Sequence, residues 1–424
     1  MTADSCRALF VTYDGLTDPL GRSQILPYLS GLSRRGHRIA ILSCEKPERS
    51  DDVPAVAKLC SEAGLDWHPI AYHKRPPIFS SVYDMRAMRR AAARLHRSQP
   101  FDLIHCRSYI PAIVGLWMKR RFGTRFLFDK RGFWAEEKVE GGSWPQSNLL
   151  FRTVYRYFKR REAECLREAD HVVSLTGAAK REMAGWPTLG ARDEAVSVIP
   201  CCVDLDHFTL PAGAGRDEAR TLLGLDPGRS VLAYLGSLGG NYLLDEMFDL
   251  FLAYRERRPG AAFLFVTRDD PAMIRRAAEA RGVGADDLVV RAARREEVPA
   301  FLAAADLGVA FKQASFSALA CSPTKLGEML AVGLPVIANS GVGDVAAVLE
   351  EPGMGALVDR FDREALLAAV DSALADPRPA AEIRDHAARW FSLEDGIARY
   401  DSVYRSLCSG PRFSPPAASA TATR

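Results

Sequence analysis

Residues 322–340 have the sequence SPTKLGEMLAVGLPVIANS, which combines a helix start, a helix, a turn and an apolar strand. Ser322 suits the N-cap position of a helix and Pro323 its first turn, where a missing N–H costs nothing. The Gly-Leu-Pro at 333–335 ends the helix and turns the chain into the apolar run at 336–338. A helix followed directly by a short, wholly apolar strand is typical of a parallel sheet covered by helices on both faces.

Two charged residues on this predicted helix are candidates for chemistry. Lys325 and Glu328 are three residues apart and therefore share one helix face. A carboxylate such as Glu328 can accept hydrogen bonds from two ribose hydroxyls, and Lys325 near the helix start can offset the charge of a phosphate. The alternative is an ordinary surface ion pair, and the spacing alone does not decide between the two.

The same alternation of short apolar runs and longer amphipathic segments extends in both directions along the chain. We predict strands at 8–12, 38–43, 67–72, 103–106, 125–128, 171–175 and 196–200, and then at 231–234, 262–266, 288–290, 307–311 and 336–338. We predict helices at 24–34, 85–97, 149–168, 244–257, 271–280, 298–304, 324–331 and 380–407. The pattern predicts an α/β protein with two doubly wound, Rossmann-like lobes that face each other across a cleft.

A break in the pattern near residue 204 indicates the division between the lobes. The segment LDHFTLPAGAGRDE contains Pro and Gly and has no hydrophobic period. We predict an N-terminal lobe at 1–204, a linker at 205–218 and a C-terminal lobe at 219–395. A helix at 396–408 is expected to pack back on the N-terminal lobe, and the tail at 409–424 is expected to be disordered because of its Pro, Ala, Ser and Thr content.

The composition of the 424 residues is that of a globular protein, with 48% hydrophobic and 26% charged residues. The longest apolar run, 110–118, is half the ~18–20 residues of a membrane span, and no secretion signal is recognised at the N-terminus. The nine cysteines, an odd number inside apolar segments, favour reduced buried thiols and a cytoplasmic location. Cys201 and Cys202 are adjacent, but no second cluster lies at a zinc-ligand spacing, so no metal site is expected.

A loop rich in glycine follows the first predicted strand of the C-terminal lobe. In YLGSLGGNYLLDEM, residues 234–247, glycines at 236, 239 and 240 allow close backbone approach, and the loop and helix start present N–H groups to an anion. This suits a diphosphate. The alternative is that the loop is only a tight strand–helix turn. The full dinucleotide-binding fingerprint is absent, so a nicotinamide-dependent enzyme is not favoured.

KLGEMLAVGLPVIA at 325–338 resembles the most recognisable motif of the retaining glycosyltransferases of family four. Other segments resemble that family in order and spacing: YDGLTDPLGRSQILPYLSGLSRRGH, DLIHCRS, DKRGFWAEE, VIPCCVDLDHF, YLGSLGG and GVGDVAAVLEEPGMGALV. The resemblance covers residues 7–407 and implies the GT-B fold and a nucleotide-diphospho-sugar as co-substrate, with no other cofactor. It implies that Glu328 holds the donor ribose and that Gly236, Ser237 and Lys325 lie at the diphosphate, with Gly21 approaching from the N-terminal lobe.

The sequence departs from the family pattern at positions that contact the donor. The carboxylate often found eight residues before the ribose glutamate is replaced by Ala320, and an Arg often found after the first strand of the second lobe is replaced by Ser237. The loop GGNYLL offers no basic residue for the second cation of that family. We therefore expect the sugar to be recognised by the loop with Ser315, Ser317 and Ser322, and the diphosphate by Lys325 together with Arg268 or a basic residue of the other lobe.

Candidate acceptor residues follow two predicted strands of the N-terminal lobe. In DKRGFWAEE, Arg131 can bind a phosphate through two hydrogen bonds, and Glu136 and Glu137 add carboxylates. The alternative is a capped turn in which Arg131 pairs with a neighbouring carboxylate. His105 and Arg107, at the end of DLIHCRS, complete the predicted acceptor set.

The Asp204-Leu205-Asp206 sequence has the form of the metal-binding D-x-D of another glycosyltransferase fold, but it lies inside VIPCCVDLDHF, which the family resemblance already explains. A metal role is therefore not expected.

Positive charge is concentrated in the first half of the chain. Residues 1–200 contain 32 Lys and Arg against 22 Asp and Glu, and the remainder contains 24 against 31. Basic stretches at 85–97, 117–125 and 152–162 all lie in this half. They are either solvated helix faces or an attachment to an anionic membrane surface.

Together these features predict a metal-independent transferase that moves a hexose-type sugar to a sugar, lipid-linked or small-molecule acceptor, and the family resemblance implies retention of configuration. The enzyme is expected in the cytoplasm or at the inner membrane surface, without nucleic acid. The alternatives are a catalytically impaired binding or regulatory relative, and a nucleotide-sugar epimerase of the same fold.

Overall fold

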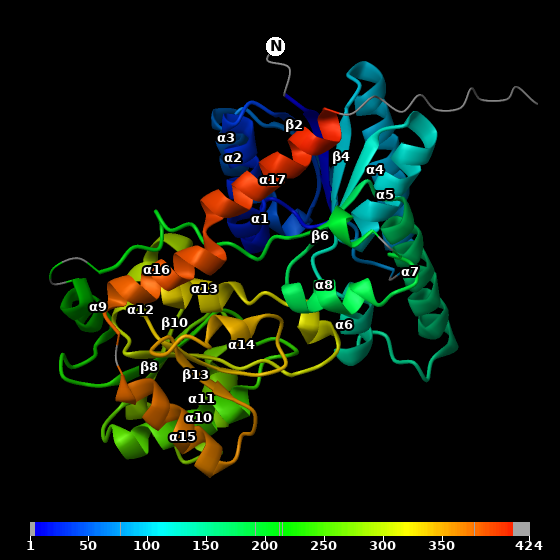
Figure 1. The fold of residues 1–424 in the computed structure, drawn as a ribbon. Coiled ribbons are helices and arrows are strands. Elements are labelled where there is room, and N and C mark those ends of the chain that lie inside the picture. The colour runs from blue at the N-terminus through cyan, green and yellow to red at the C-terminus, as the bar shows by residue number, and fades with distance from the viewer. Residues whose placement is uncertain are drawn as a thin grey trace, which may run out of the picture. The chain divides into compact units, whose positions relative to one another are not determined.

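The alternation of strands and helices produces two parallel sheets in the computed structural model (Figure 1), which describes residues 5–409 apart from Pro77, Ala191, Ala212, Ala214 and Pro377. The chain divides into two compact units, and each is described here by itself. The first unit comprises the residues up to Ile199 and those from Glu394 onward, and the second is Pro200–Leu393.

The first unit contains a sheet of seven strands, as far as the described residues show, in the order β3-β2-β1-β4-β5-β6-β7. All neighbouring strands run parallel. Its strands are β1 Arg7–Thr12, β2 Arg38–Glu45, β3 Asp66–Ala71, β4 Leu103–Arg107, β5 Arg125–Asp129, β6 His171–Ser174 and β7 Val196–Val198. Its helices are α1 Pro19–Gln24, α2 Leu26–Arg34, α3 Val53–Glu62, α4 Phe79–Ser98, α5 Tyr109–Phe122, α6 Trp134–Glu140, α7 Leu149–Glu168, α8 Gly177–Ala184 and α17 Leu393–Cys408.

The second unit contains a parallel sheet of six strands within the described part of the chain, in the order β10-β9-β8-β11-β12-β13. Its strands are β8 Val231–Leu235, β9 Ala262–Val266, β10 Leu288–Arg291, β11 Leu307–Ala310, β12 Val336–Asn339 and β13 Gly355–Val358. Its helices are α9 Gly215–Leu223, α10 Leu244–Arg257, α11 Pro271–Glu279, α12 Val298–Ala303, α13 Thr324–Ala331, α14 Val345–Val348, α15 Arg363–Ala375 and α16 Ala380–Phe391.

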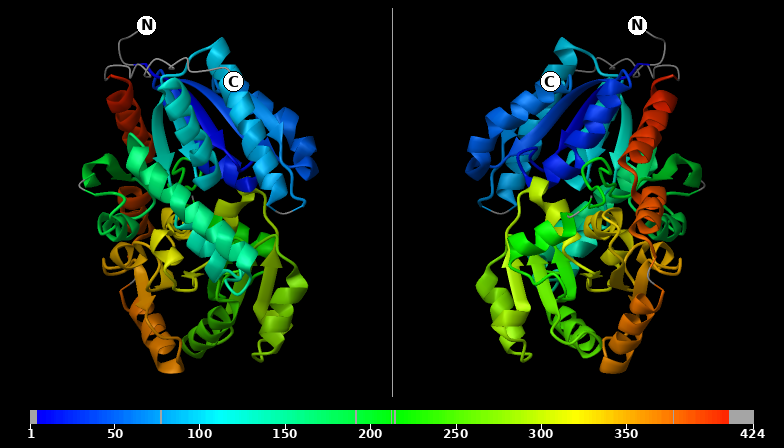
Figure 2. Two further views of the ribbon diagram at one scale, coloured as in Figure 1. Left: turned by 90° about the vertical axis from the view of Figure 1, so that its right-hand side faces the viewer. Right: turned by 90° about the vertical axis from the view of Figure 1, so that its left-hand side faces the viewer.

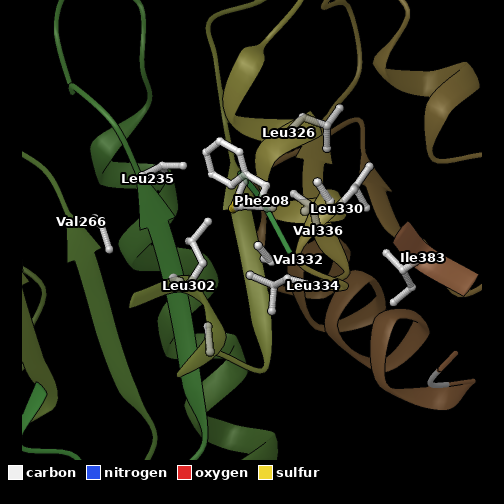
Figure 3. Close-up of a cluster of buried hydrophobic side chains, with 14 of the residues drawn as sticks. Phe208, Leu235, Val266, Leu302, Leu326, Leu330, Val332, Leu334, Val336 and Ile383 are labelled. Atoms are coloured by element: carbon white, nitrogen blue, oxygen red, sulfur yellow. The ribbon is translucent and has the colours of Figure 1, made fainter. Parts of the chain in front are cut away.

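The central strands of both sheets are buried along their whole length, as expected where helices cover both faces. Every residue of β4, β8 and β9 is buried, and the views in Figure 2 show the strands of each sheet flanked by helices. In the second unit, side chains from α13, β12 and α16 converge in one apolar cluster, which Figure 3 shows with Leu330, Val336 and Ile383 labelled. This cluster anchors α13, the helix that carries Lys325 and Glu328.

Strand order reverses once in each sheet, between β1 and β4 and between β8 and β11. In open α/β sheets ligands bind at the carboxyl ends of the strands at such a switch point. Candidate ligand-binding residues are therefore those that follow these four strands.

Several predicted boundaries differ from the structure. The predicted linker at 205–218 lies inside the second unit, and its last four residues already belong to α9. The predicted helix at 24–34 begins two residues later, as α2, because Gln24 is the last residue of α1 and Pro27, which lacks the N–H needed to continue α1, lies in the first turn of α2. The predicted helix at 380–407 is interrupted at Ser392, whose backbone is extended. Apart from Ser409, the predicted tail lies outside the described residues.

The expectation of reduced cysteines throughout is wrong for one pair. Cys6, just before β1, and Cys408, at the end of α17, form a disulfide within the first unit. The other seven cysteines form no disulfide in the described structure, and most are buried. The pair is 402 residues apart in sequence, so no local spacing indicates it.

Candidate functional site

The centre of the candidate site in the second unit is the ammonium group of Lys325, on the first turn of α13. Lys325 Nζ donates a hydrogen bond of 2.6 Å to the hydroxyl of Tyr234, which in turn donates at 2.6 Å to the backbone oxygen of Ser237. Nζ also lies 3.5 Å from the ring centroid of Tyr242 and 4.3 Å from that of Tyr234. The two rings and the glycine loop therefore hold one ammonium group at the carboxyl end of β8.

Burial changes the protonation of this lysine. Desolvation lowers the pKa of Lys325 to about 7, although the Cys321 thiol and the Glu328 carboxylate favour the charged form. An anion bound beside Nζ would restore the missing countercharge and raise that pKa again. The site is thus arranged to gain a proton when an anionic ligand binds.

Gly236 forms the turn beside this ammonium group, in a backbone conformation that favours glycine. Its φ of 98° is in the left-handed region that favours glycine, and a Cβ there would lie 3.4 Å from both Cε and Nζ of Lys325. The backbone of the loop is partly committed: the Gly236 N–H donates to the oxygen of Val266, and the Leu238 N–H donates to the Asp269 carboxylate. Two of the loop N–H groups that were predicted to face the diphosphate therefore already donate to the protein. Side chains would have to balance more of the phosphate charge.

A second cation that the sequence reasoning missed lies against the same tyrosine. Lys312 follows β11 at the switch point, and its Nζ is 5.2 Å from the ring centroid of Tyr242. Its backbone is clamped by Asn339, whose side chain accepts from the Lys312 N–H at 2.8 Å and donates to the Lys312 oxygen at 2.9 Å. No carboxylate pairs with Lys312 among the described residues. The sequence feature that could have indicated Lys312 as a candidate is its position just after β11, a strand at the switch point of the sheet.

Glu328 lies one turn further along α13 and is partly exposed. Desolvation raises the pKa of its carboxyl group to about 7, against the opposing influence of Arg295 and Lys325. Within the described structure its carboxylate accepts no hydrogen bond from the protein, so both oxygens are available to a ligand.

The serine-rich loop has mainly structural contacts. Ser322 is not the N-cap of α13, which begins at Thr324 after Pro323, because the Ser322 hydroxyl instead accepts from the Cys201 N–H at 3.1 Å. The hydroxyls of Ser315 and Ser317 lie 3.2 Å apart, and Ser317 is buried in the short helix η5 Ser317–Ala320. The replaced carboxylate position, Ala320, is also buried.

Arg268 follows β9 and is exposed, and its Nε donates to the oxygen of Ala293 at 3.3 Å. Asp204 Oδ1 accepts from the backbone N–H groups of Asp206 and His207, so the D-x-D sequence forms a local turn. No group of three potential metal-ligating side chains was found in the described parts of the chain.

In the first unit, Gly21 is required by packing. A Cβ at this position would lie 2.3 Å from the backbone oxygen of Gly15 and 2.6 Å from Cα of Leu16. The glycine lets α1 lie directly on the turn after β1.

The predicted acceptor residues are not gathered in one open site. His105 is buried, meets the ring of Phe10 edge to face and hydrogen-bonds to Tyr404 at 2.9 Å, so it is a core residue between the sheet and α17. Glu136 is buried and pairs with Lys159 at 2.6 Å, whereas Glu137 is exposed.

The two arginines of the predicted acceptor set are also engaged. Arg131 has a positive φ of 52° and lies 3.9 Å from Asp129, as in the capped-turn alternative. Arg107 is buried and pairs with Asp14, which follows β1.

A cavity of about 1020 Å³ lies instead at the carboxyl ends of β1 and β4, next to these predicted residues. Asp14 lines it from the loop after β1, and Ile110 from the first turn of α5, which follows β4. Trp134 and Lys138 line it from α6, the helix that also carries Glu136 and Glu137. None of the predicted acceptor residues lines this cavity, although it lies at the end of β4, the strand that carries His105 and Arg107.

Comparison with known proteins identifies the family. The model of Glycosyltransferase Family 4 matches residues 27–207, and that of Glycosyl transferases group 1 matches residues 229–376. The D-inositol 3-phosphate glycosyltransferase of Segniliparus rotundus is 27% identical over 340 residues, covering 76% of this chain and 69% of that protein. The enzyme of the same name from Nocardiopsis dassonvillei is 26% identical over 374 residues, covering 84% and 80%.

Solved structures share the fold. Sucrose-phosphate synthase from Thermosynechococcus elongatus superimposes with a TM-score of 0.70 at 18% identity, covering 95% of this chain and 99% of that one. Anabaena HepE, solved with UDP and glucose, gives 0.68 at 15% identity, covering 95% and 100%. The predicted family and fold are thereby confirmed: the chain is a glycosyltransferase of family 4, with the GT-B fold of two Rossmann-like lobes each built on a parallel sheet.

Proposed function

We propose that this protein transfers a hexose-type sugar from a nucleoside-diphosphate donor, bound by the second unit, to an acceptor hydroxyl, with retention of configuration. The observation that carries the proposal is the ammonium group of Lys325, held between Tyr234 and Tyr242 beside the Gly236 turn. HepE, which shares the fold, was solved with UDP-glucose, which supports a nucleotide sugar as the donor here.

In this proposal Lys325 and Lys312 balance the diphosphate. When the bond between the sugar C1 and the diphosphate oxygen breaks, negative charge develops on that oxygen, and two nearby ammonium groups stabilise it. Glu328, whose carboxylate has no protein partner in the described structure, accepts from the ribose hydroxyls. Ser315 and Ser317 lie on the loop that would face the hexose.

We further propose that the reaction needs no metal ion, because the charge of the leaving diphosphate is balanced by lysines. Transfer is assigned to attack by the acceptor oxygen on the face that the diphosphate leaves, with the acceptor proton passing to the departing phosphate oxygen. This assignment needs no nucleophile from the protein, and it preserves the configuration at C1.

One alternative is favoured by a specific observation. The replacement of the family carboxylate by Ala320, which is buried, removes an acidic contact to the sugar and would fit a relative that binds nucleotide sugars without transferring them. Such a protein would bind the donor but would not cleave it, even slowly to water.

The test combines binding and turnover. UDP-glucose and other nucleotide sugars are screened by thermal shift, since a ligand at a hundred times its Kd adds about 2.7 kcal/mol to stability. Donor hydrolysis is then measured for the wild type, for Glu328→Ala and for Glu350→Ala, an exposed glutamate of the same unit. We expect Glu328→Ala to lose donor turnover with an unchanged Tm and Glu350→Ala to retain it.

Equal turnover of both variants, or unfolding of Glu328→Ala, would show that the ribose role is wrong. Binding of a nucleotide sugar without any hydrolysis or transfer would favour the non-catalytic alternative. Activity that is lost in EDTA and restored by Mn²⁺ or Mg²⁺ would contradict the metal-independent mechanism.

We also propose that the first unit acts at an anionic membrane surface from the cytoplasmic side. No described helix is long and apolar enough to span a bilayer. Part of the basic charge is neutralised within the first unit, because Arg120 pairs with Glu164 and Glu168 and Lys119 pairs with Asp170. Arg94 and Arg97 on α4 are exposed and have no carboxylate partner among the described residues.

Each lysine or arginine near an anionic surface contributes about 1 kcal/mol, so a few give salt-sensitive attachment. Co-sedimentation with phosphatidylserine vesicles at low salt, lost at high salt and with phosphatidylcholine vesicles, is the expected result. If the protein co-sediments with neither type of vesicle, this attachment would be excluded.

A further inference from the structure

The cavity in the first unit combines aromatic walls with positive charge. Its apolar side is formed by a packed group of rings: Trp134 lies 5.1 Å from Trp144 and 5.0 Å from Phe158, and Trp144 stacks on Phe158 at 5.5 Å, all centroid to centroid. These residues come from α6, the following loop and α7. Because the rings support one another, they form a fixed apolar wall rather than flexible surface side chains.

Four of the cations that line this cavity have no acidic partners in the described structure. Lys74, Arg86, Arg89 and Lys138 all line it, and none of them pairs with a carboxylate among the described residues. Arg89 is partly buried in the middle of α4, and its Nε is buried with no hydrogen-bond partner. Burial lowers the pKa of its guanidinium, and the charged groups that act on it include the cations Arg86 and Arg161.

The carboxylates that line the cavity are, in contrast, already neutralised. Asp14 pairs with Arg107, and Asp18 pairs with Lys46 at 2.8 Å. The cavity therefore has a net excess of unpaired positive charge. A partly desolvated guanidinium without a counterion is unfavourable in the empty protein, so an anionic ligand would be bound with a gain.

Exposed apolar side chains continue from the lining. Phe79 and Tyr83 on the first turns of α4 are 75% and 55% exposed, and each directly follows in sequence a residue that lines the cavity, Ile78 or Val82. At the start of α7, Leu150 lines the cavity and is still 56% exposed. Apolar surface of this kind beside a binding cavity indicates that part of the ligand is hydrocarbon.

We infer that this cavity binds an acceptor that joins a phosphate group to a long hydrocarbon chain, as in a lipid-linked phosphate. The inference rests on the proposed function, in which the first unit holds the acceptor, and it specifies the class of that acceptor. The phosphate lies at Arg89 and Lys138, and the chain lies along the rings of Trp144 and Phe158 and past Leu150. A cavity of about 1020 Å³ is larger than a phosphorylated sugar or polyol alone requires.

The experiment measures binding in the absence of donor, so that it is independent of transfer. Dodecyl phosphate, kept below its critical micelle concentration, is titrated into the full chain and followed by tryptophan fluorescence, because Trp134 and Trp144 line the cavity. Dodecyl maltoside, a neutral amphiphile, and inorganic phosphate are titrated in parallel. We expect dodecyl phosphate to bind at least tenfold more tightly than either.

Matched variants locate the site. Arg89→Gln is expected to weaken binding of dodecyl phosphate at least tenfold, and Lys138→Gln, nearer the surface, to weaken it to a smaller extent. Arg90→Gln, which neutralises the exposed neighbour of Arg89 that does not line the cavity, is expected to bind like the wild type. The Tm of each variant checks that it is folded, and Lys138→Gln provides the test if Arg89→Gln is not.

Three other outcomes would overturn the inference, each in a distinct way. Equal affinity for inorganic phosphate would indicate a free phosphorylated acceptor, and equal affinity for dodecyl maltoside would indicate an apolar surface without anion recognition. Equal weakening by Arg89→Gln and Arg90→Gln would place binding on the general charge of α4. A failure of donor binding or hydrolysis would contradict the proposed function but would leave these binding results as they are.

Discussion

At the scale of single residues, the second unit concentrates its few lysines at one point. Between residues 200 and 393 the sequence contains two lysines, Lys312 and Lys325, and both ammonium groups lie against the ring of Tyr242. The loop after β8, where related enzymes often carry basic residues, has none. Lys312 therefore supplies from β11 a charge that the loop lacks.

Replacing this second lysine tests its role. Lys312→Met is expected to weaken binding of the nucleotide sugar about tenfold, the size of one charge-assisted contact worth about 1.5 kcal/mol. Lys312→Arg should recover most of the affinity, because a cation is restored at the clamped backbone position. Arg275→Met, at an exposed position of α11, is the matched control for lost positive charge. Affinities for the nucleotide sugar are measured by isothermal titration. An equal loss of affinity in Lys312→Met and Arg275→Met would show that Lys312 acts only through the overall charge of the protein.

The two groups whose pKa values lie near 7 predict a pH profile for donor affinity. Lys325 must be protonated to hold the diphosphate, so its contribution is present below pH 7 and falls, by up to tenfold per unit, as the pH rises above 7. Glu328 must be ionised to accept from both ribose hydroxyls, so its contribution is present above pH 7 and is lost as the pH falls. Affinity is therefore expected to be maximal near pH 7.

The variant Glu328→Gln separates the two limbs of this profile. It removes the carboxyl group that titrates, so its affinity, although lower, should decrease steadily from pH 6 to pH 8.5. A nucleotide-diphospho-sugar is the correct probe, because its diphosphate carries no proton that titrates near neutrality. If the affinity of Glu328→Gln still falls as the pH is lowered below 7, a group other than Glu328 is responsible for that fall.

At the scale of elements, helix α5 fills the space beside the switch-point strands of the first unit. It is buried along most of its length and packs on β1, β4 and β5. Gly115, in the middle of the helix, lies so close to the sheet that a Cβ would be 2.5 Å from Sγ of Cys106 and 2.6 Å from Cε2 of Phe126. The absence of a side chain sets the distance between α5 and the sheet.

Gly115→Ala should consequently destabilise the protein by about 1–3 kcal/mol, the usual cost of overpacking, although alanine favours helices. Gly185→Ala is the control, since its φ is −76° and its new Cβ would find no atom closer than 3.5 Å. Chemical denaturation of both variants provides the comparison. A neutral Gly115→Ala would mean that α5 can move outward without loss.

Elements whose pattern is complete within a short window were predictable from the sequence. The helices α7, α10 and α13 have the predicted bounds, because their apolar period is regular and their ends carry turn residues. Strand β13, with the sequence GALV, is missing from the prediction, because a segment of four residues is too short to show a hydrophobic period and it pairs only with β12 in the described structure. No helix is predicted at α5, where the sequence shows only an apolar run. A helix that is covered on nearly all sides has little amphipathic pattern.

The candidate site shows the same limit. Lys325 and Glu328 follow from helical spacing within one segment, and Gly236 follows from the turn it must make. The contribution of Lys312 depends on the pairing of β11 with β8, and the burial of His105 depends on α17, which is nearly 300 residues away in sequence. Contacts of that range depend on tertiary packing that no local pattern encodes.

At the scale of the whole molecule, the chain returns to the unit in which it began. Helix α17 packs on α2, where Ile397 occupies the space that a side chain at Gly31 would need, and Asp401 accepts from Arg35 at 3.3 Å and lies 2.7 Å from Nε2 of His37. The disulfide between Cys6 and Cys408 closes this return within the first unit. The first unit is thus made of two separate parts of the sequence that are joined covalently.

Reduction of this disulfide is expected to lower the Tm of the first unit by several degrees, because loss of a native disulfide typically costs about 2–5 kcal/mol. The bond connects residues 402 apart, so the unfolded chain gains much freedom when it is broken. Dithiothreitol should therefore lower the Tm of the wild type and leave that of Cys6→Ser/Cys408→Ser unchanged. Thiol titration of the unfolded, unreduced protein should detect seven thiols, the number of cysteines outside the bond. Nine reactive thiols, or a wild-type Tm that is indifferent to reduction, would show that α17 is held on the first unit by packing and ion pairs alone.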